Sequence, residues 1–257
     1  MRNIEKVKQT YFVLQQIGHQ EQRRRNAETS LGFIWNILNP LLYMIILSTY
    51  YMNVIIHDID RFPVFVFTGI TIFNYYNTAT KGALKSLVNN KNLLLKTKQP
   101  IDIFINSKIL EGFREFLFSS IAVIPIFLYF KVHISWRAIL VVPILFLTTV
   151  IISSMGKILA ICYVYFADID YLYSVLMTML IFVSGTFLPL GSYPEQIKVL
   201  LTYNPIFLSI FLYRNSLMYG IPSYWGVWVK FIIWAVGLFV FSNWLFEKKR
   251  DDCVNRL

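Results

Sequence analysis

The sequence predicts an all-α integral membrane protein with six transmembrane helices. Its 257 residues are 56% hydrophobic and only 15% charged, whereas soluble domains are usually about a quarter charged. The apolar residues form long runs, and the basic residues gather beside those runs. No stretch is both polar and long enough to fold separately, so we expect a single membrane domain over residues 1–257. Within it, residues 1–28 and 247–257 are expected to be cytoplasmic, and residues 29–246 to hold the spans.

A helix needs about 20 mostly apolar residues to cross the hydrocarbon core of a membrane. Successive apolar stretches predict spans at residues 29–56, 62–80, 116–130, 138–167, 171–190 and 224–246. The third stretch is short, so its helix must extend back over Glu111, Arg114 and Glu115. The fourth is interrupted only by Lys157, which we expect either to line a cavity or to reach towards the interface along its alkyl stem.

The distribution of lysine and arginine predicts that both termini are cytoplasmic. The N-terminal segment to residue 33 and the loop after the second span each hold six of these residues, and the C-terminal tail holds four. Only five lie on the opposite side, Arg214 among them. Because the basic residues collect beside the spans, the formal charge of +10 reflects membrane topology, and we expect no nucleic-acid partner.

The stretch SGTFLPLGSYPEQIKVLLTYNP, residues 184–205, interrupts the apolar pattern after the fifth span with three prolines and two glycines. The apolar character then resumes for only 15 residues, 199–213, which is too few to cross a bilayer. If that segment crossed, the basic tail would lie outside, against the charge bias. We therefore predict a re-entrant helical pair that enters from the outer face. An amphipathic helix on the outer surface is the alternative.

Two N-terminal features predict contact with the membrane surface. Apolar residues recur at steps of three and four within residues 4–17, with lysines between them, which is typical of an amphipathic interface helix. Arg23, Arg24 and Arg25 follow just before the first span. These arginines are either a topological signal or a site for an anionic lipid or phosphate headgroup, because guanidinium groups pair well with phosphate.

The predicted cytoplasmic loop at residues 84–102 is basic, yet it contains three consecutive leucines. An exposed run of leucines is unfavourable unless a partner or the membrane covers it. Pro100 ends any helix near Gln99, so we expect a short helix here. The residues predicted to dock a partner protein, or alternatively to lie on the lipid surface, are Leu93, Leu94, Leu95 and Lys96.

The start of the third span carries Lys108, Glu111, Arg114 and Glu115 on one helical face, where opposite charges can pair. Charged residues within membranes are often functional. These four are close to the cytoplasmic end, however, so we expect a salt-bridged turn at the interface.

Aromatic residues make up 17% of the chain, which is more than interfacial belts alone require. Aromatic faces can stack on sugar rings and can form a weakly specific lining for a pathway. The candidates for such a lining lie in the first two spans, and they are Tyr43, Tyr50, Phe67, Phe73, Tyr75 and Tyr76.

The motifs of nucleotide binding and of common catalytic sites are absent from the sequence. It contains no G-x-x-x-x-G-K-[S/T], so we expect no ATP site in this chain. Its three histidines are isolated, without metal-ligand spacing, and there is no serine elbow. The carboxylates in mid-membrane that usually accompany a transported proton or sodium ion are also missing. We expect no catalytic residue, metal site or bound cofactor.

Three segments together resemble the permease subunits of bacterial type-2 ABC transporters that export lipid-linked polysaccharides. RRRNAETSLGFIWNILNPLL, residues 23–42, is similar to the start of the first span in that family. NNKNLLLKTKQPIDIFINSKILEG, residues 89–112, is similar to its cytoplasmic loop and the start of its third span. Residues 166–220 are similar to its fifth span and re-entrant region, where the landmarks are Pro189, Leu190, Pro194, Asn204, Pro205 and Arg214.

The resemblance implies a half-transporter that pairs as a homodimer in the bacterial cytoplasmic membrane. Each copy would bind a separate cytoplasmic P-loop ATPase, giving two ATPase subunits, and ATP and Mg²⁺ would be bound by that partner. The substrate would be an O antigen, a teichoic acid or a capsular polymer on a lipid carrier. An ion-coupled or other multi-pass transporter of lipid-linked glycans, or a membrane enzyme acting on them, is the alternative.

The resemblance also assigns roles to particular segments. Residues 93–96 would dock on the ATPase, and the arginines at 23–25 would lie near the lipid pyrophosphate of the substrate. The broken segment after the fifth span would gate the outer mouth of the pathway. The residues implied in that gate are Pro189, Pro194, Glu195, Asn204 and Pro205.

Overall fold

The computed structural model describes residues 32, 34–54, 61–96 and 100–257, without the side chains of residues 51–54, 95 and 96. Every regular element in this part of the chain is helical, which confirms the all-α prediction. The elements are α2 (Ile34–Val54), α3 (Phe62–Asn89), α4 (Lys91–Lys96), α5 (Asp102–Ile121), α6 (Val123–Tyr129), η1 (Trp136–Leu140), α7 (Val141–Tyr165), α8 (Ile169–Leu180), η2 (Leu190–Ser192), α9 (Glu195–Tyr203), α10 (Pro205–Arg214), η3 (Asn215–Tyr219) and α11 (Trp225–Arg256). The predicted N-terminal interface helix and the arginines at 23–25 lie outside the described residues.

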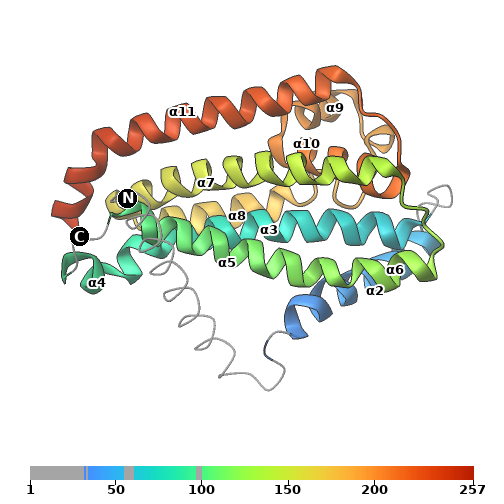
Figure 1. Ribbon diagram of the computed structural model, residues 1–257, viewed down its shortest axis with the longest axis horizontal. Coiled ribbons are helices and arrows are strands. Elements are labelled where there is room, and N and C mark those ends of the chain that lie inside the picture. The colour runs from blue at the N-terminus through green and yellow to red at the C-terminus, as the bar shows by residue number, and fades with distance from the viewer. Residues whose placement is uncertain (1–31, 33, 55–60, 97–99) are drawn as a thin grey trace, which may run out of the picture.

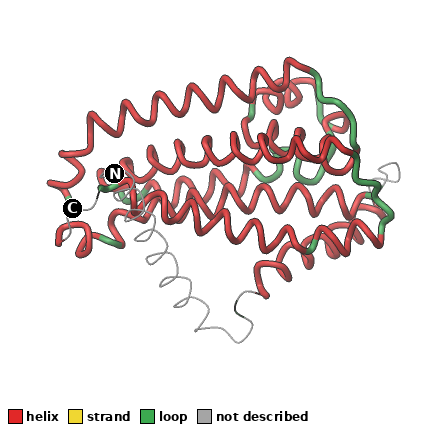
Figure 2. The backbone as a smooth tube through the Cα atoms, viewed as in Figure 1, coloured by secondary structure: helices red, strands yellow, loops and turns green. Residues whose placement is uncertain are grey.

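The long helices run side by side along one axis (Figures 1 and 2). α4 and the C-terminus lie at one end of this bundle, which we call the α4 end. The first turns of α3, α7 and α11 lie towards the opposite end, where α9 and α10 are also found, and we call this the α10 end.

Three continuous helical stretches are long and apolar enough to cross a membrane, and the α9–α10 pair is a fourth if it is counted as one bent span. The three stretches are Asp102–Tyr129, Trp136–Tyr165 and Trp225–Arg256. The first of them confirms that the third predicted span reaches back over its charged residues. α2, α3 and α8 lie where the other spans were predicted, but they are shorter or more polar. Six spans and two cytoplasmic termini therefore stay predictions.

α3 is more polar than a lipid-facing helix because protein surrounds most of it. Residues 62–73 are all buried, and the helix packs against α2, α5, α7 and α10. Small residues let two neighbours come close: a Cβ on Gly112 would lie 2.7 Å from the Ala79 Cβ, and one on Gly156 would lie 2.8 Å from the Ala83 Cβ. Such small residues bring membrane helices into contact. α3 is the central helix of the bundle.

The fifth predicted span is wrong in its second half, because α8 ends at Leu180 instead of continuing to residue 190. Residues 181–187 form turns and bends, and residues 184–187 are buried. Gly185 has a φ of 64°, in the left-handed region that glycine adopts without strain. Backbone that leaves a helix inside a membrane needs hydrogen-bond partners within the protein.

Arg214 of α10 supplies partners for this broken backbone. Its guanidinium group donates to the carbonyl oxygens of Gly185, Thr186 and Phe65, and it lies 3.5 Å from the centroid of the Phe65 ring. Arginine suits this task because its five donors are held in a rigid fork. The residue is 4% exposed. Arg214 is therefore not a charge in an outer loop, as the count of lysine and arginine residues on each side of the membrane had assumed. It joins α3, α10 and the turn after α8 into one unit, which we call the arginine knot.

α9 and α10 meet at Asn204 with an angle of 87° between them. The Asn204 side chain accepts a hydrogen bond from the Ile206 N–H, which caps α10, and it donates to the Val183 carbonyl. The segment 199–213 is therefore two helices, each anchored to the turn after α8.

Two contacts of the α9–α10 pair, one at its corner and one just after η3, hold it beside the first turns of α11 and α7 and favour a pair that returns to the end it left. The Lys230 amine, in the second turn of α11, lies 4.5 Å from the centroid of the Tyr203 ring in α9. Arg137, just before α7, donates to the Gly220 carbonyl after η3. α10 is buried along most of its length, whereas α9 buries only Leu201. How deeply the pair enters the membrane stays a prediction.

Gly69 gives a test of the arginine knot, because a Cβ at this position would collide with Arg214 Nη2 and lie 2.8 Å from the Thr186 oxygen. We expect Gly69→Ala to lower the melting temperature of the detergent-solubilised protein by roughly 5 °C or more. Displacing the guanidinium leaves buried carbonyl groups unpaired, at about 1–3 kcal/mol for each group. Gly237→Ala, where a Cβ meets open space, is the control, since glycine to alanine inside a helix is otherwise stabilising. Equal melting temperatures for the two variants would contradict the role of Arg214.

Single cysteines on the two ends of the bundle test the predicted orientation. Lys91 in α4 and Gln196 in α9 are both exposed, and Cys162 and Cys253 would first be replaced by serine. In intact cells, a maleimide that cannot cross the membrane is expected to label Gln196→Cys and to leave Lys91→Cys unlabelled until the cells are permeabilised. The reverse pattern would invert the topology derived from the charge bias.

Candidate functional site

The second half of α3 has one face that is not buried, and this face is almost entirely polar. Beyond Phe73, the positions that are not buried recur at steps of three and four, as expected for one side of a helix. We call the polar residues among them the polar stripe, and they are Asn74, Asn77, Thr78, Lys81, Lys85 and Asn89. Amide and amine groups that face hydrocarbon are costly. The stripe is therefore suited to face water or another polar surface, and its part up to Thr78 lies within the predicted second span.

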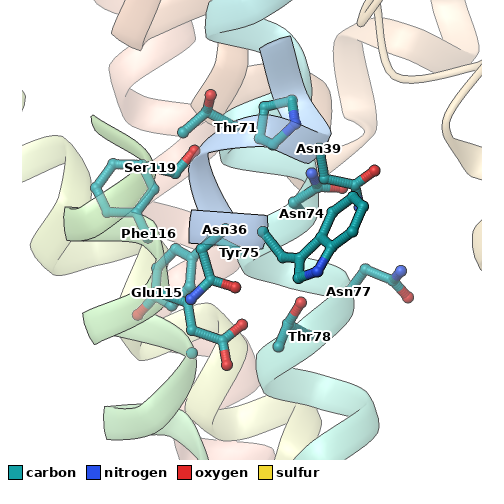
Figure 3. A pocket seen from close by; sticks show the side chains of 13 residues that line it. Asn36, Asn39, Thr71, Asn74, Tyr75, Asn77, Thr78, Glu115, Phe116 and Ser119 are labelled. Carbon is teal, nitrogen blue, oxygen red and sulfur yellow. The ribbon is translucent and has the colours of Figure 1, made fainter. Parts of the chain in front are cut away.

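The polar stripe reaches a cavity of about 240 Å³ between α2, α3 and α5. We call this cavity the amide pocket, because four asparagines line it. Figure 3 shows Asn36 and Asn39 of α2, Asn74 and Asn77 of α3, and Glu115 and Ser119 of α5 around the same space. The complete lining is Trp35, Asn36, Asn39, Pro40, Thr71, Asn74, Tyr75, Asn77, Thr78, Gly112, Glu115, Phe116 and Ser119.

Two polar atoms of the amide pocket have no hydrogen-bond partner within the described part of the chain. They are Asn77 Oδ1 and Ser119 Oγ, and Ser119 as a whole is only 5% exposed. A buried polar group without a partner costs about 1–3 kcal/mol. Atoms of this kind commonly mark the place of a bound water or ligand.

The aromatic wall of the pocket is held in place by contacts behind it. The Tyr75 hydroxyl and Thr149 Oγ1 of α7 are 2.9 Å apart, in a hydrogen bond. The Tyr75 ring packs at 5.8 Å from the Phe113 ring and 5.4 Å from the Phe116 ring, measured between centroids. Trp35 of α2 also lines the pocket and is 45% exposed.

The chemistry of the lining limits what the pocket can hold. Its side chains offer amides, hydroxyls, one carboxylate and aromatic rings, and no lysine, arginine or histidine. Over the described residues, no three metal-ligating side chains come together. The arrangement suits an uncharged molecule that both donates and accepts hydrogen bonds.

The six aromatic residues predicted to line a channel are distributed between two environments. Tyr43 and Tyr50 of α2 are exposed, at 50% and 55%. The four on α3 are buried in the core of this chain, and they are Phe67, Phe73, Tyr75 and Tyr76. Of these four, Tyr75 also lines the amide pocket. Their role as a channel lining stays a prediction.

The predicted docking leucines form part of α4, as a short helix after α3. Leu93 is 43% exposed, whereas Leu94 is 6% exposed and belongs to the core. The side chains of Leu95 and Lys96 lie outside the description. Of the two leucines that can be placed, Leu93 is the more exposed.

Ion pairs connect the helices near the α4 end. Lys85 of the polar stripe pairs with Asp170 in the first turn of α8 at 2.7 Å. Lys157 of α7 donates to Asn243 of α11 at 2.8 Å and lies 3.4 Å from Asp102, the first residue of α5. Lys157 therefore ties three helices together, where the sequence had left open a cavity or a path to the interface.

Within α5 itself, Lys108 and Glu111 pair at 3.1 Å and both are buried. This confirms the ion pairing predicted for the start of the third span. Because the pair is buried, it lies between helices of the bundle and not on an exposed interfacial turn.

The residues implied in the outer gate mark the ends of successive short helices. Pro189 precedes η2, Pro194 precedes α9 and Pro205 begins α10. Asn204 forms the corner between the last two helices, and Glu195 at the start of α9 pairs with Lys198 at 2.7 Å. These positions fit a segment that prolines break at fixed points, and the gating role itself stays a prediction.

The polar stripe and the amide pocket were missed in the sequence, although a signal for them is present. Asn74, Asn77, Thr78 and Lys81 recur at steps of three and four, which places them on one helical face. Asn36 and Asn39 repeat the same spacing in the first span. That α2, α3 and α5 bring these faces together could not be known before the helices were placed.

Comparison with known proteins places this architecture among membrane transporters. Residues 13–218 match the profile of the ABC-2 type transporter family. The O-antigen export system permease protein RfbA of Myxococcus xanthus is 22% identical over 256 residues, covering 98% of each chain. RfbA of Klebsiella pneumoniae is 22% identical over 234 residues, covering 88% of this chain and 90% of the relative. The polysialic acid transport protein KpsM of Escherichia coli is 24% identical over 241 residues, covering 91% and 92%.

The family profile covers most of the chain, from before α2 to the end of the α9–α10 region. It therefore includes the helices that form the amide pocket, the polar stripe and the arginine knot. The similarity to the export permeases extends over nearly the same length. This chain belongs to the ABC-2 type transporter family.

Proposed function

We propose that this chain is the membrane-spanning permease subunit of an ABC exporter that moves a lipid-linked polysaccharide across the bacterial cytoplasmic membrane. Family membership makes it a component of a transporter rather than an enzyme. The relatives in O-antigen export and polysialic acid transport support a glycan as the cargo. O antigens, teichoic acids and capsular polymers are the candidate substrates.

The observation that carries this proposal is the polar stripe on the central helix. A polysaccharide is strongly hydrated, so its path through a membrane needs hydrogen-bonding groups in place of water. The stripe provides amides, a hydroxyl and amines from the α4 end to the amide pocket. Most of the remainder of α3 is buried, so the exposed polar groups are confined to one side.

We place the source of energy on a separate subunit. The chain has no P-loop, so ATP and Mg²⁺ would be bound by a cytoplasmic ATPase, with one copy for each permease of a homodimer. α4 is the element proposed to dock on it, through Leu93. The arginines at 23–25 would hold the phosphate of the lipid carrier or the headgroups of membrane lipids.

The ion pairs near the α4 end can transmit a movement of the ATPase to the helices of the permease. α4 connects α3 to α5, and the first residue of α5 lies beside Lys157, which also contacts α11. Lys85 joins α3 to α8 in the same region. A displacement of α4 would therefore be passed to several helices as a rigid-body shift, and the α9–α10 segment would gate the opposite mouth.

Deleting the gene tests the proposed function directly. We expect the surface polysaccharide of the host cell to accumulate on the cytoplasmic side of the membrane, and the intact gene to restore export. In the complemented cells, export should persist when an uncoupler collapses the proton gradient at constant ATP. It should stop when the Walker lysine of the partner ATPase is replaced. Export that stops with the gradient and survives loss of the ATPase would favour an ion-coupled carrier.

Replacing Leu93 tests the docking surface on α4. We expect Leu93→Ser to reduce co-purification of the co-expressed ATPase about tenfold, because burying a leucine side chain contributes about 1.5–3 kcal/mol. Leu200→Ser is the matched control, since Leu200 is 63% exposed on α9 towards the α10 end. If the two variants retain the same amount of ATPase, α4 is not the docking element.

A further inference from the structure

We propose that the amide pocket binds one neutral sugar ring of the glycan as the chain passes, so that the permease recognises its cargo within the membrane. This inference rests on the proposed function and adds a binding site with a chemical preference. The site lies where the polar stripe meets α2 and α5.

The unpaired polar atoms point to a ligand with hydroxyl groups. Asn77 Oδ1 accepts hydrogen bonds, and Ser119 Oγ can donate or accept them. Both are buried without a partner among the described residues. Asn36 and Asn39 face the same space from α2 (Figure 3). A sugar ring carries several hydroxyl groups, and each of them can donate and accept a hydrogen bond. Such a ring can therefore pair with Asn77 Oδ1, with Ser119 Oγ and with the asparagines of α2.

Trp35 supplies a surface for the apolar face of a sugar, whereas Tyr75 is only 2% exposed and forms part of the pocket wall. Trp35 lines the pocket and remains 45% exposed, so its indole is available at the mouth. The Tyr75 ring is fixed by the hydrogen bond to Thr149 and by the rings of Phe113 and Phe116. Aromatic side chains with a polar edge are well suited to ligands that combine apolar faces with polar rims.

The charges in the wall favour a neutral sugar over an acidic one. Binding a carboxylate or phosphate group usually requires a lysine or arginine, and the lining contains none. Its one ionisable group is the carboxyl of Glu115. The volume of about 240 Å³ lies near the lower end of small-molecule sites, which suits a single ring.

Two substitutions separate ligand binding from a structural role. Ser119→Ala and Asn77→Leu each remove an unpaired polar atom, so without a ligand they should leave the fold as stable as before or more stable. If the pocket binds sugar, each variant should lower the rate of polysaccharide export about fivefold, as expected for one lost hydrogen bond to the ligand. The melting temperature of the purified full chain should not fall. Ser242→Ala is the matched control, because Ser242 is also buried but its hydroxyl donates to the Phe239 carbonyl of its own helix.

Photo-crosslinking in exporting cells identifies the ligand. We would place benzoylphenylalanine at Trp35, and as a control at Phe146, which is 67% exposed on α7. Glycan on the permease would be detected by periodate oxidation and hydrazide labelling, and its sugars identified after hydrolysis. We expect neutral sugars attached at position 35 and none at position 146.

The outcomes are distinguishable from a failure of the proposed function. If the wild-type chain supports export, and both Ser119→Ala and Asn77→Leu export at the wild-type rate, the pocket holds only water and the inference is overturned. Acidic sugars at position 35 would overturn the preference for a neutral ring. Equal labelling at positions 35 and 146 would overturn the location of the site. Export that does not depend on this chain at all would instead refute the proposed function.

Discussion

The hydrogen bonds of Arg214 to backbone carbonyls are the interaction on which the rest of the architecture depends. They allow the chain to leave its helix after Leu180 within an apolar environment, because the guanidinium and Asn204 satisfy carbonyl groups that would otherwise be unpaired. The break then allows α9 and α10 to fold back as a bent pair. As a result, α11 begins at the α10 end and runs to the α4 end, where the C-terminus lies (Figure 1).

The central helix has two halves that differ in burial. Residues 62–73 of α3 are buried on all sides, and the Phe65 carbonyl in this half is bound by Arg214. The half from Asn74 onward is open on one face and carries the polar stripe. A helix with one half enclosed and one half open presents polar groups along part of its length only. The amide pocket lies where the two halves meet, since it is lined by Thr71 and Asn74 together.

Much of the fold could be predicted from the sequence, because long apolar runs and charge bias are local signals. The extension of the third helix over its charged residues is one example, and the break in the helical pair at Pro205 is another. The fifth span was predicted too long because residues 181–190 are uncharged and mostly apolar, although Gly185 and Pro189 lie among them. The carbonyl groups of the turn after this helix are bound by Arg214, roughly thirty residues later in the sequence, and no local pattern identifies that partner.

The candidate site was less predictable, for a related physical reason. The aromatic residues of α3 are conspicuous in the sequence, yet Phe67, Phe73 and Tyr76 are buried in the core, because aromatic side chains are the largest apolar groups available to fill it. The asparagines of α2 and α3 are unremarkable singly, and they form a pocket only because two helices present the same spacing to each other. Pairing of faces is a tertiary property. Leu94 illustrates the same limit, since one of two adjacent leucines packs inward and the other does not.

The packing of α2 and α8 indicates where a path could open at the lowest cost. α8 buries only Tyr173 and Met177, and it is joined to α3 beside the polar stripe by two polar contacts, Tyr173 with Thr80 at 2.7 Å and Lys85 with Asp170 at 2.7 Å. α2 is also largely exposed on its described side chains. Moving α8 would expose little apolar core, whereas moving α5 or α7 would break the close contacts at Gly112 and Gly156. The polar stripe is therefore bordered by α2 and α8, which are the less buried helices, and it belongs to α3, which α5 and α7 hold by close contacts.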